Sequence, residues 1–124
     1  MINILQICLP PDSTIEESLR IIDSGAVKIA LVVDSDNKLL GTLSDGDIRR
    51  GFLRKKNLND TIEGVYFKNS VTAKKSSSKE FLSYLCSINR ISHLPIIDND
   101  GKVIDLFVID DELLKRQYEN NVVL

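Results

Sequence analysis

The chain has 124 residues, which suffices for one compact domain with a real core but not for two independent ones. Its 16 Lys and Arg residues against 18 Asp and Glu residues give a net charge of -2, and each half carries eight of the former and nine of the latter, so neither half is a basic arm for nucleic acid. No apolar run approaches the roughly 20 residues of a membrane span, and the N-terminus has no charged leader, so we expect a cytoplasmic protein with neither membrane nor nucleic-acid partners.

In the first half, the pattern of apolar residues predicts a helix, a hairpin and a second helix. The first helix ends at Gly25, and its apolar positions at helical spacing are Ile15, Leu19 and Ile22. Residues 28–34 and 38–43 are β-branched or Leu-rich runs around a polar turn, so they predict a hairpin of buried strands. The second helix is expected over residues 44–56.

The second half predicts the same order of elements. Serines at positions 76–78 precede a helix, whose apolar positions are Leu82, Leu85 and Cys86. Residues 93–98 and 102–108 then form a hairpin around an Asn-Asp-Gly turn. A last helix is expected to begin near Asp110.

The two halves repeat one another at an offset of 64 residues. Residues 29–41 (IALVVDSDNKLLG) recur as residues 93–105 (HLPIIDNDGKVID). The residues that meet an identical partner at this offset are Ser13, Glu16, Asp34, Asp36, Lys38 and Asp47, matched to Ser77, Glu80, Asp98, Asp100, Lys102 and Asp111. Two copies of one supersecondary unit usually bury their apolar faces against each other, and the seam between them leaves clefts for a ligand.

These repeats divide the chain into four parts. We expect the first repeat over residues 1–56, a linker over 57–70 and the second repeat over 71–118. The linker carries the apolar residues 65–67, which should pack on the seam between the repeats. Residues 119–124 have no repeat partner and end on an apolar, strand-like run, so we expect them to be the start of a further, truncated C-terminal domain.

The repeated order of helix, two strands and helix resembles the cystathionine-β-synthase (CBS) domain, and the resemblance covers essentially the whole chain as a CBS pair. It implies an α/β (α+β) fold, in which each repeat is a short sheet with two helices and the repeats pack about a pseudo-twofold axis. The segment from Gly41 to Arg50 is similar to the G-h-x-[ST]-x-x-D segment with which CBS modules hold a nucleotide. By that likeness Ser44 lies at the phosphate and Asp47 at the ribose.

The variant Ser-Asp-Gly-Asp-Ile-Arg-Arg resembles a narrower group of CBS modules, those attached to sugar-phosphate enzymes. Such modules either follow an isomerase domain or precede a sugar nucleotidyltransferase domain. Because this chain begins at Met1 and runs on into residues 121–124, which look like a first strand of the second enzyme, we expect the regulatory N-terminal part of a nucleotidyltransferase. The Gly-rich loop of that enzyme is not in the sequence.

The chemistry of the segment supports a nucleotide site without the resemblance. A Ser at a helix N-terminus offers a hydroxyl beside unpaired N–H groups, so Ser44 suits a phosphate. Asp47 can accept from ribose hydroxyls, and Arg49 or Arg50 can donate to phosphate oxygens. The residues expected to contact the base are Lys28, Ile29 and Ala30. Ser44 and Asp47 equally fit a capping box worth about 1 kcal/mol with no ligand at all, and both interpretations remain open.

The second repeat departs from this pattern. At the offset of 64, Val108 takes the place of Ser44 and Asp105 that of Gly41, while Asp111 still matches Asp47. Because Val cannot bond a phosphate, the first cleft is the better candidate. Asp111 is either a ligand contact or a first-turn residue of the last helix, where carboxylates favour the helix dipole.

Other residues give weaker signals. His93, the single histidine, is expected to be packed or capping rather than a ligand. Cys8 and Cys86 lie far apart and are expected to be reduced thiols. Phe81 and Tyr84 lie at helical spacing and should be core or dimer contacts. The five bases at positions 49–56 form a solvated face or meet an acidic partner, and no catalytic triad, metal-ligand spacing or P-loop is present.

The sequence therefore predicts a regulatory module that is not itself an enzyme. It would bind an adenine nucleotide or a related phosphorylated metabolite, with AMP, ADP or ATP as regulatory ligands and no required cofactor or metal. It would act on a C-terminal catalytic domain in cis and associate as a homodimer. The alternative is a structural module that holds catalytic subunits together and binds nothing.

Overall fold

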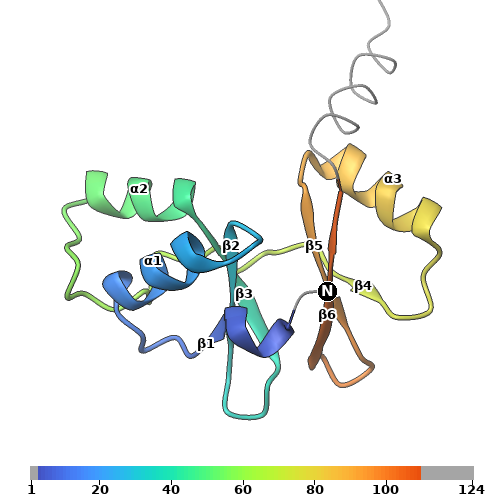
Figure 1. The fold of residues 1–124 in the computed structure, drawn as a ribbon, viewed down its shortest axis with the longest axis horizontal. Helices are drawn as coiled ribbons and strands as arrows, with labels where there is room; N and C mark the ends of the chain where they lie inside the picture. Colours follow the sequence, from blue (N-terminus) through green and yellow to red (C-terminus); the bar gives the residue numbers. More distant parts are fainter. Residues whose placement is uncertain (1–2, 110–124) are drawn as a thin grey trace, which may run out of the picture.

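The computed structural model describes residues 3–109. Its elements, in chain order, are η1 (Ile4–Ile7), β1 (Cys8–Leu9), α1 (Ile15–Ser24), β2 (Ile29–Val33), β3 (Leu39–Ser44), α2 (Asp45–Leu53), β4 (Ala73–Lys74), α3 (Lys79–Asn89), β5 (His93–Ile97) and β6 (Val103–Val108) (Figure 1). The helix predicted near Asp110, the candidate Asp111 and the tail at 119–124 lie outside the described residues.

The described chain forms two three-stranded sheets of the same topology. In the first, β1 runs parallel to β2, which pairs antiparallel with β3; β4, β5 and β6 repeat this order. The pairing of the strands is repeated as well. Leu9 lies opposite Val32, and the residues 64 positions further along, Ala73 and Ile96, also lie opposite each other. The sheets stand side by side with the helices on their outer faces (Figure 1). This arrangement confirms the predicted α+β fold.

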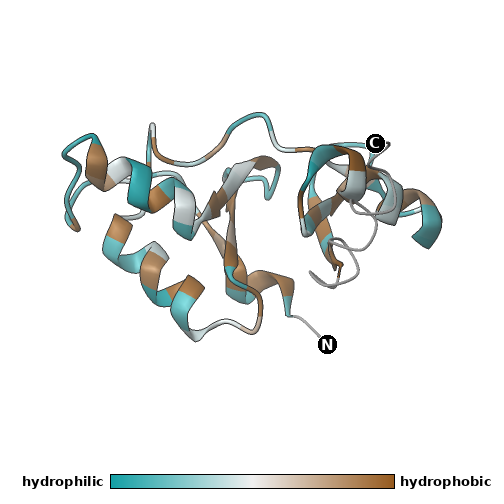
Figure 2. Cartoon of the chain, turned by 90° about the horizontal axis from the view of Figure 1, so that it is seen from above, coloured by the Kyte–Doolittle hydropathy of each residue, from teal (hydrophilic) through white to brown (hydrophobic). Residues whose placement is uncertain are grey.

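The first two helices begin where predicted. Thr14 caps α1 by accepting from the backbone N–H of Glu17 at 3.1 Å, and both helices of the first repeat alternate apolar and polar residues along their length (Figure 2). The second helix ends earlier than the predicted range of 44–56. Lys55 adopts a left-handed conformation with φ of 69°, and the N–H of Lys56 donates back to the carbonyl of Gly51 at 3.0 Å. This is the geometry of a helix C-terminus, so α2 stops at Leu53.

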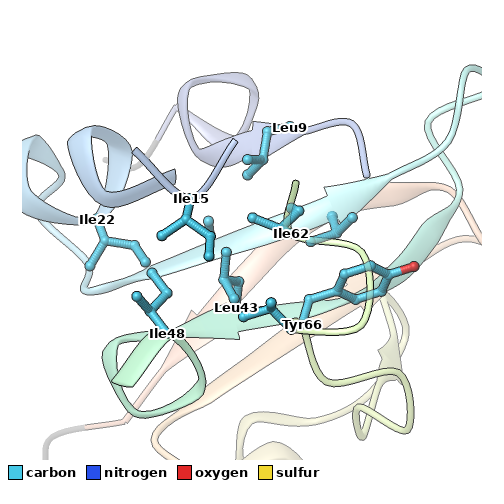
Figure 3. Packing of buried hydrophobic residues seen from close by; sticks show 10 residues of the cluster. Leu9, Ile15, Ile22, Leu43, Ile48, Ile62 and Tyr66 are labelled. Carbon is cyan, nitrogen blue, oxygen red and sulfur yellow. The ribbon is translucent and has the colours of Figure 1, made fainter. Parts of the chain in front are cut away.

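Strand β2 is buried on both faces, because it lies between two apolar clusters. Ala30 and Val32 face the first cluster, which the helices α1 and α2 cover and which Figure 3 shows from close by. The remaining residues of β2 face the second repeat. The cluster on that side joins Ile29, Leu31 and Val33 to Val103 and Leu106 of β6. The repeats therefore share apolar surface, as the tandem pattern predicts.

The two hairpin turns also pair with each other through their backbones. The N–H of Leu39 donates to the carbonyl of Gly101, and the N–H of Val103 donates to that of Asn37, both at 3.0 Å. Asn37 and Gly101, as well as Leu39 and Val103, are related by the offset of 64, so these bonds obey a pseudo-twofold symmetry. Asn37 and Gly101 both have positive φ, 64° and 85°, which these residue types tolerate.

The residues predicted to be a linker are largely part of the first repeat. Ile62, Val65 and Tyr66 are buried in the first apolar cluster, and Figure 3 shows Ile62 and Tyr66 within it. Val65 lies against Gly51 of α2. The N–H of Ile62 donates to the carbonyl of Ser13 at 2.9 Å, which ties this segment to the start of α1. Of the three apolar residues expected on the seam, the first two therefore fill the first core. Phe67 is half-exposed and faces the second repeat.

Two further expectations concern side chains of α3 and the thiols. Phe81 and Tyr84 are 46% and 58% exposed, so the predicted place in the core is wrong for both.

Cys8 and Cys86 are free thiols, in agreement with the expectation of reduced cysteines. Burial raises the pKa of both, that of Cys86 to about 11, so both are protonated at neutral pH.

Asp98 holds the second hairpin turn in shape, and this predicts an acid dependence of stability. Its Oδ1 accepts from the N–H of Lys102 and from that of Asp100, both at 2.9 Å, and the bond from Lys102 is the largest cause that lowers the pKa of Asp98. A lowered folded-state pKa means that this stabilisation is present above the unfolded pKa and is lost as pH falls through the folded value.

We therefore expect Asp98→Ala to lower the melting temperature at pH 7 and to lose less stability than the wild type between pH 5 and pH 2. Circular dichroism melts over this range measure both effects. Asp100→Ala is the matched control, because its backbone N–H still donates to Asp98. Equal pH profiles for wild type and Asp98→Ala would contradict the prediction.

Candidate functional site

A cleft of about 610 Å³ opens between the two repeats. One wall comes from β3, the start of α2 and the segment after Tyr66, and the other from the end of α3 and the start of β5. The polar residues that line it are Thr42, Ser44, Asp47, Arg50, Asn69, Ser70, Asn89, Arg90, Ser92 and His93. The apolar ones are Ile29, Phe67, Val71, Ile91 and Pro95. A mixed lining of this size suits a small polar molecule with one apolar face.

Ser44 and Asp47 form a capping box at the start of α2. The backbone N–H and the hydroxyl of Ser44 donate to Oδ2 of Asp47 at 2.9 and 3.0 Å, and the N–H of Asp47 donates to the Ser44 hydroxyl at 3.3 Å. Both hydrogen bonds of a capping box are therefore present, which confirms that Ser44 and Asp47 cap the helix. Because the same residues line the cleft, the box also presents them at a fixed orientation toward whatever enters it.

The other oxygen of Asp47 is engaged as well. Arg50 donates from Nη2 to Oδ1 of Asp47 at 2.8 Å, and the side chains are 59% and 14% exposed, respectively. The guanidinium lies over Gly46, where an added Cβ would be only 3.3 Å from Nη1 and Nη2. The carboxylate at the cleft is therefore paired on both oxygens.

The second repeat contributes the facing wall. Arg90 ends α3 in a left-handed conformation with φ of 55°, and its N–H donates to the carbonyls of the last helical turn. His93 begins β5, and its Nδ1 lies 3.1 Å from the Ser92 hydroxyl. The cleft thus places Arg50 and Arg90, one from each repeat, around a single space. Two guanidinium groups favour an anion there.

The segment after Tyr66 closes one side of the cleft by pairing with β3. Thr42 and Phe67 exchange backbone hydrogen bonds of 3.0 and 2.8 Å, and the Thr42 hydroxyl lies 2.8 Å from that of Ser70. This approach requires glycine at the neighbouring position. A Cβ on Gly41 would collide with the carbonyl oxygen of Phe67 and lie 2.7 Å from the ring of Tyr66. The first glycine of the segment therefore has a structural role.

The structure gathers some of the predicted site residues and separates others. Ser44, Asp47, Arg50 and Ile29 line the cleft. Three candidates do not, namely Lys28, Ala30 and Arg49. Lys28 donates from Nζ to the carbonyl of Asp23 and lines a separate hollow of about 460 Å³ along α1. Ala30 is fully buried in the first core, and Arg49 is exposed on the face of α2 away from the cleft lining.

Sequence reasoning missed the wall from the second repeat. Asn89, Arg90 and Ser92 were not considered, and His93 was expected to be packed or capping. The repeat itself carries the missing signal, since residues 89–93 correspond to 25–29 at the offset of 64. In a pseudo-twofold pair, the entry to the hairpin of one repeat faces the helix start of the other. Residues 89–93, and not 28–30 alone, should therefore have been placed opposite Ser44.

The pseudo-twofold mate of this cleft has a different chemistry. A second cleft of about 400 Å³ is lined by Asn3, Gln6, Ile7, Ile21, Ser24, Gly25, Ala26 and Val27. At the offset of 64, Ala26 stands where the first cleft has Arg90, and Val108 stands where it has Ser44. No charged residue belongs to the part of this lining that the structure describes. The anion-binding groups gather in the first cleft.

Within residues 3–109, no three or more His, Cys, Asp and Glu side chains gather as a metal site. In the same part of the chain, no helix is both long and apolar enough to cross a lipid bilayer.

Two like sheets related by a pseudo-twofold axis, with a polar cleft at their seam, define a tandem-repeat α+β module. Residues 6–54 match the family model of the CBS domain. The solved CBS domain NE2398 superimposes with a TM-score of 0.74 at 25% identity, over 90% of this chain and 87% of that one. Residues 6–54 thus match the CBS domain, and the described chain has the fold of CBS proteins, as the resemblance implied.

Two solved relatives of the same fold hold adenosine-based ligands. The CBS domain pair of protein MJ0100, in complex with 5'-methylthioadenosine and S-adenosyl-L-methionine, matches with a TM-score of 0.74 and 23% identity, over 90% of each chain. The cytosolic domain of the Mg2+ channel MgtE, in complex with ATP, matches with a TM-score of 0.71 and 21% identity, over 86% of this chain and 43% of that one.

Curated relatives contain a similar segment within longer enzymes. Inosine-5'-monophosphate dehydrogenase of Methanocaldococcus jannaschii is 29% identical over 90% of this chain and 22% of its own length. Homoserine O-acetyltransferase of Methanohalobium evestigatum is 31% identical over 79% of this chain and 19% of its own length. The chain thus spans about a fifth of the length of these relatives.

The contact at Gly41 predicts the effect of one added methyl group. We expect Gly41→Ala to destabilise the fold by about 1–3 kcal/mol, because the Cβ forces the segment at Phe67 away from β3. Hydrogen exchange should become faster at the N–H of Phe67, which donates to Thr42, while the β5 and β6 amides serve as the internal control. Unchanged stability together with unchanged exchange at Phe67 would refute this account.

Proposed function

We propose that this chain is a non-catalytic regulatory CBS pair that binds an adenine nucleotide, such as AMP, ADP or ATP, in the cleft between its repeats. The observation that carries the proposal is the convergence of Ser44, Asp47 and Arg50 with Arg90 around one space of about 610 Å³. The ligands held by the MJ0100 and MgtE relatives, which share the adenosine group, support the choice of adenine.

Each part of such a ligand has a matching group in the cleft. Phosphate oxygens would accept from the guanidinium groups of Arg50 and Arg90, since charge-assisted bonds to Arg are the strong ones. The Ser44 hydroxyl has one proton, so it would donate to a phosphate by turning away from Oδ2 of Asp47. Ribose hydroxyls would donate to the carboxylate of Asp47. The base would lie against the half-exposed ring of Phe67 and the apolar side chain of Ile29, which line the same cleft.

Ligand binding would regulate by changing how the two repeats pack. A ligand that contacts both walls stabilises one relative arrangement of the sheets and shifts the population by no more than its differential affinity. We propose that a catalytic domain in cis, in the cytoplasm, responds to this shift. The variant Ser44–Arg50 segment favours a sugar-phosphate nucleotidyltransferase, although the curated relatives carry their similar segments in other enzymes.

An alternative is a structural module that joins subunits and binds nothing. The observation that favours it is an apolar stripe on α3, where Phe81, Tyr84 and Ile88 lie on one face and are each about half-exposed. Apolar side chains at i, i+3 and i+7 are the pattern of a helix face that packs on a partner. We propose that this face forms a homodimer, which is compatible with either role.

Calorimetric titration with AMP, ADP, ATP, CMP and CTP tests nucleotide binding. We expect saturable binding of an adenine nucleotide, weakened about 10- to 100-fold by Asp47→Asn, because the loss of a charged acceptor costs about 1.5–3 kcal/mol. Asp45→Asn is the matched control, since Asp45 lies in the same first turn of α2 but does not line the cleft. Silence from every nucleotide would leave the structural role as the better proposal.

Sedimentation velocity tests the dimer. We expect Tyr84→Glu to convert dimers of the wild type to monomers, because a carboxylate on the half-exposed stripe would be buried without a partner. Lys79→Glu places the same charge at the exposed start of α3 as the control. A monomeric wild type, or a Tyr84→Glu variant that stays dimeric, would contradict the proposed face.

A further inference from the structure

We propose that Arg50 selects phosphorylated ligands by competing with them for Asp47. This inference rests on the proposed nucleotide site and adds a mechanism of specificity to it. In the structure Arg50 donates to Oδ1 of Asp47 at 2.8 Å, while Oδ2 accepts from the backbone N–H and the hydroxyl of Ser44. Oδ1, the carboxylate oxygen outside the capping box, is thus already bonded to the same cation that a phosphate attracts.

The balance of charges decides which ligands free that acceptor. The pair of Asp47 and Arg50 is neutral as a whole, and the guanidinium is 59% exposed, so the pair is weak and opens easily. A ligand phosphate offers the guanidinium a replacement anion and releases Oδ1 for a ribose hydroxyl. An uncharged nucleoside offers no replacement, so its hydroxyl must share Oδ1 with Arg50 or displace it. The site therefore prefers the nucleotide over the nucleoside by more than the direct contact with the phosphate alone would give.

Parallel titration with AMP and adenosine tests the competition. In Arg50→Gln, we expect AMP to bind about 10-fold more weakly and adenosine about 2- to 3-fold more tightly, because the charge-assisted bond is lost while Oδ1 is freed. A simple phosphate contact would weaken AMP and leave adenosine unchanged. The gain in adenosine affinity is therefore the result specific to this inference.

A further variant controls for the loss of an exposed arginine. Arg20→Gln is the matched control, because Arg20 forms a similar exposed ion pair with Glu16 at 3.0 Å on α1, outside the cleft lining. It should change neither affinity.

The outcomes separate the two proposals. AMP binding without the adenosine gain in Arg50→Gln would overturn the competition alone. A wild type that binds neither AMP nor adenosine would overturn the proposed nucleotide site and the competition together. Circular dichroism melts of each variant confirm that a lost affinity does not reflect a lost fold.

Discussion

The pairing of the two hairpin turns is the contact on which the rest of the arrangement depends. Two backbone hydrogen bonds join Leu39 to Gly101 and Val103 to Asn37, and the apolar cluster beside them is shared by β2 and β6. Backbone bonds have a fixed geometry, so together with this cluster they set the angle between the sheets. That angle brings the start of α2 opposite the end of α3, and the cleft exists because of it.

The repeat places two clefts in related positions, but their linings differ. The first has arginines on both walls and a serine at the start of a helix, whereas the described part of the second is lined by amides, aliphatic side chains and small residues. Within the described residues, a symmetric fold thus holds an asymmetric distribution of charge.

Capping and ligand binding are not competing explanations of Ser44 and Asp47. The capping box satisfies N–H groups that the helix start would otherwise leave without partners, and it fixes the side chains that face the cleft. A ligand would therefore meet side chains whose orientation is already fixed by folding, so binding would not have to order them. Arg50 extends the same network by one bond, so helix stability and site chemistry are coupled through one carboxylate.

Local pattern alone determined the elements of this protein, because helical spacing, apolar runs and turn residues act over a few neighbours. It placed α1, both hairpins and the capped start of α2, and the offset of 64 established the tandem fold. Only the tertiary structure decided which residues meet. In the structure Lys28 lies beside α1 and not at the cleft, and Val65 and Tyr66 are buried in the first core. Arg90 and His93 lie across the cleft from Ser44. The first two of these contacts depend on packing within the first repeat, and the last depends on the angle between two sheets far apart in the chain, which no short-range pattern encodes.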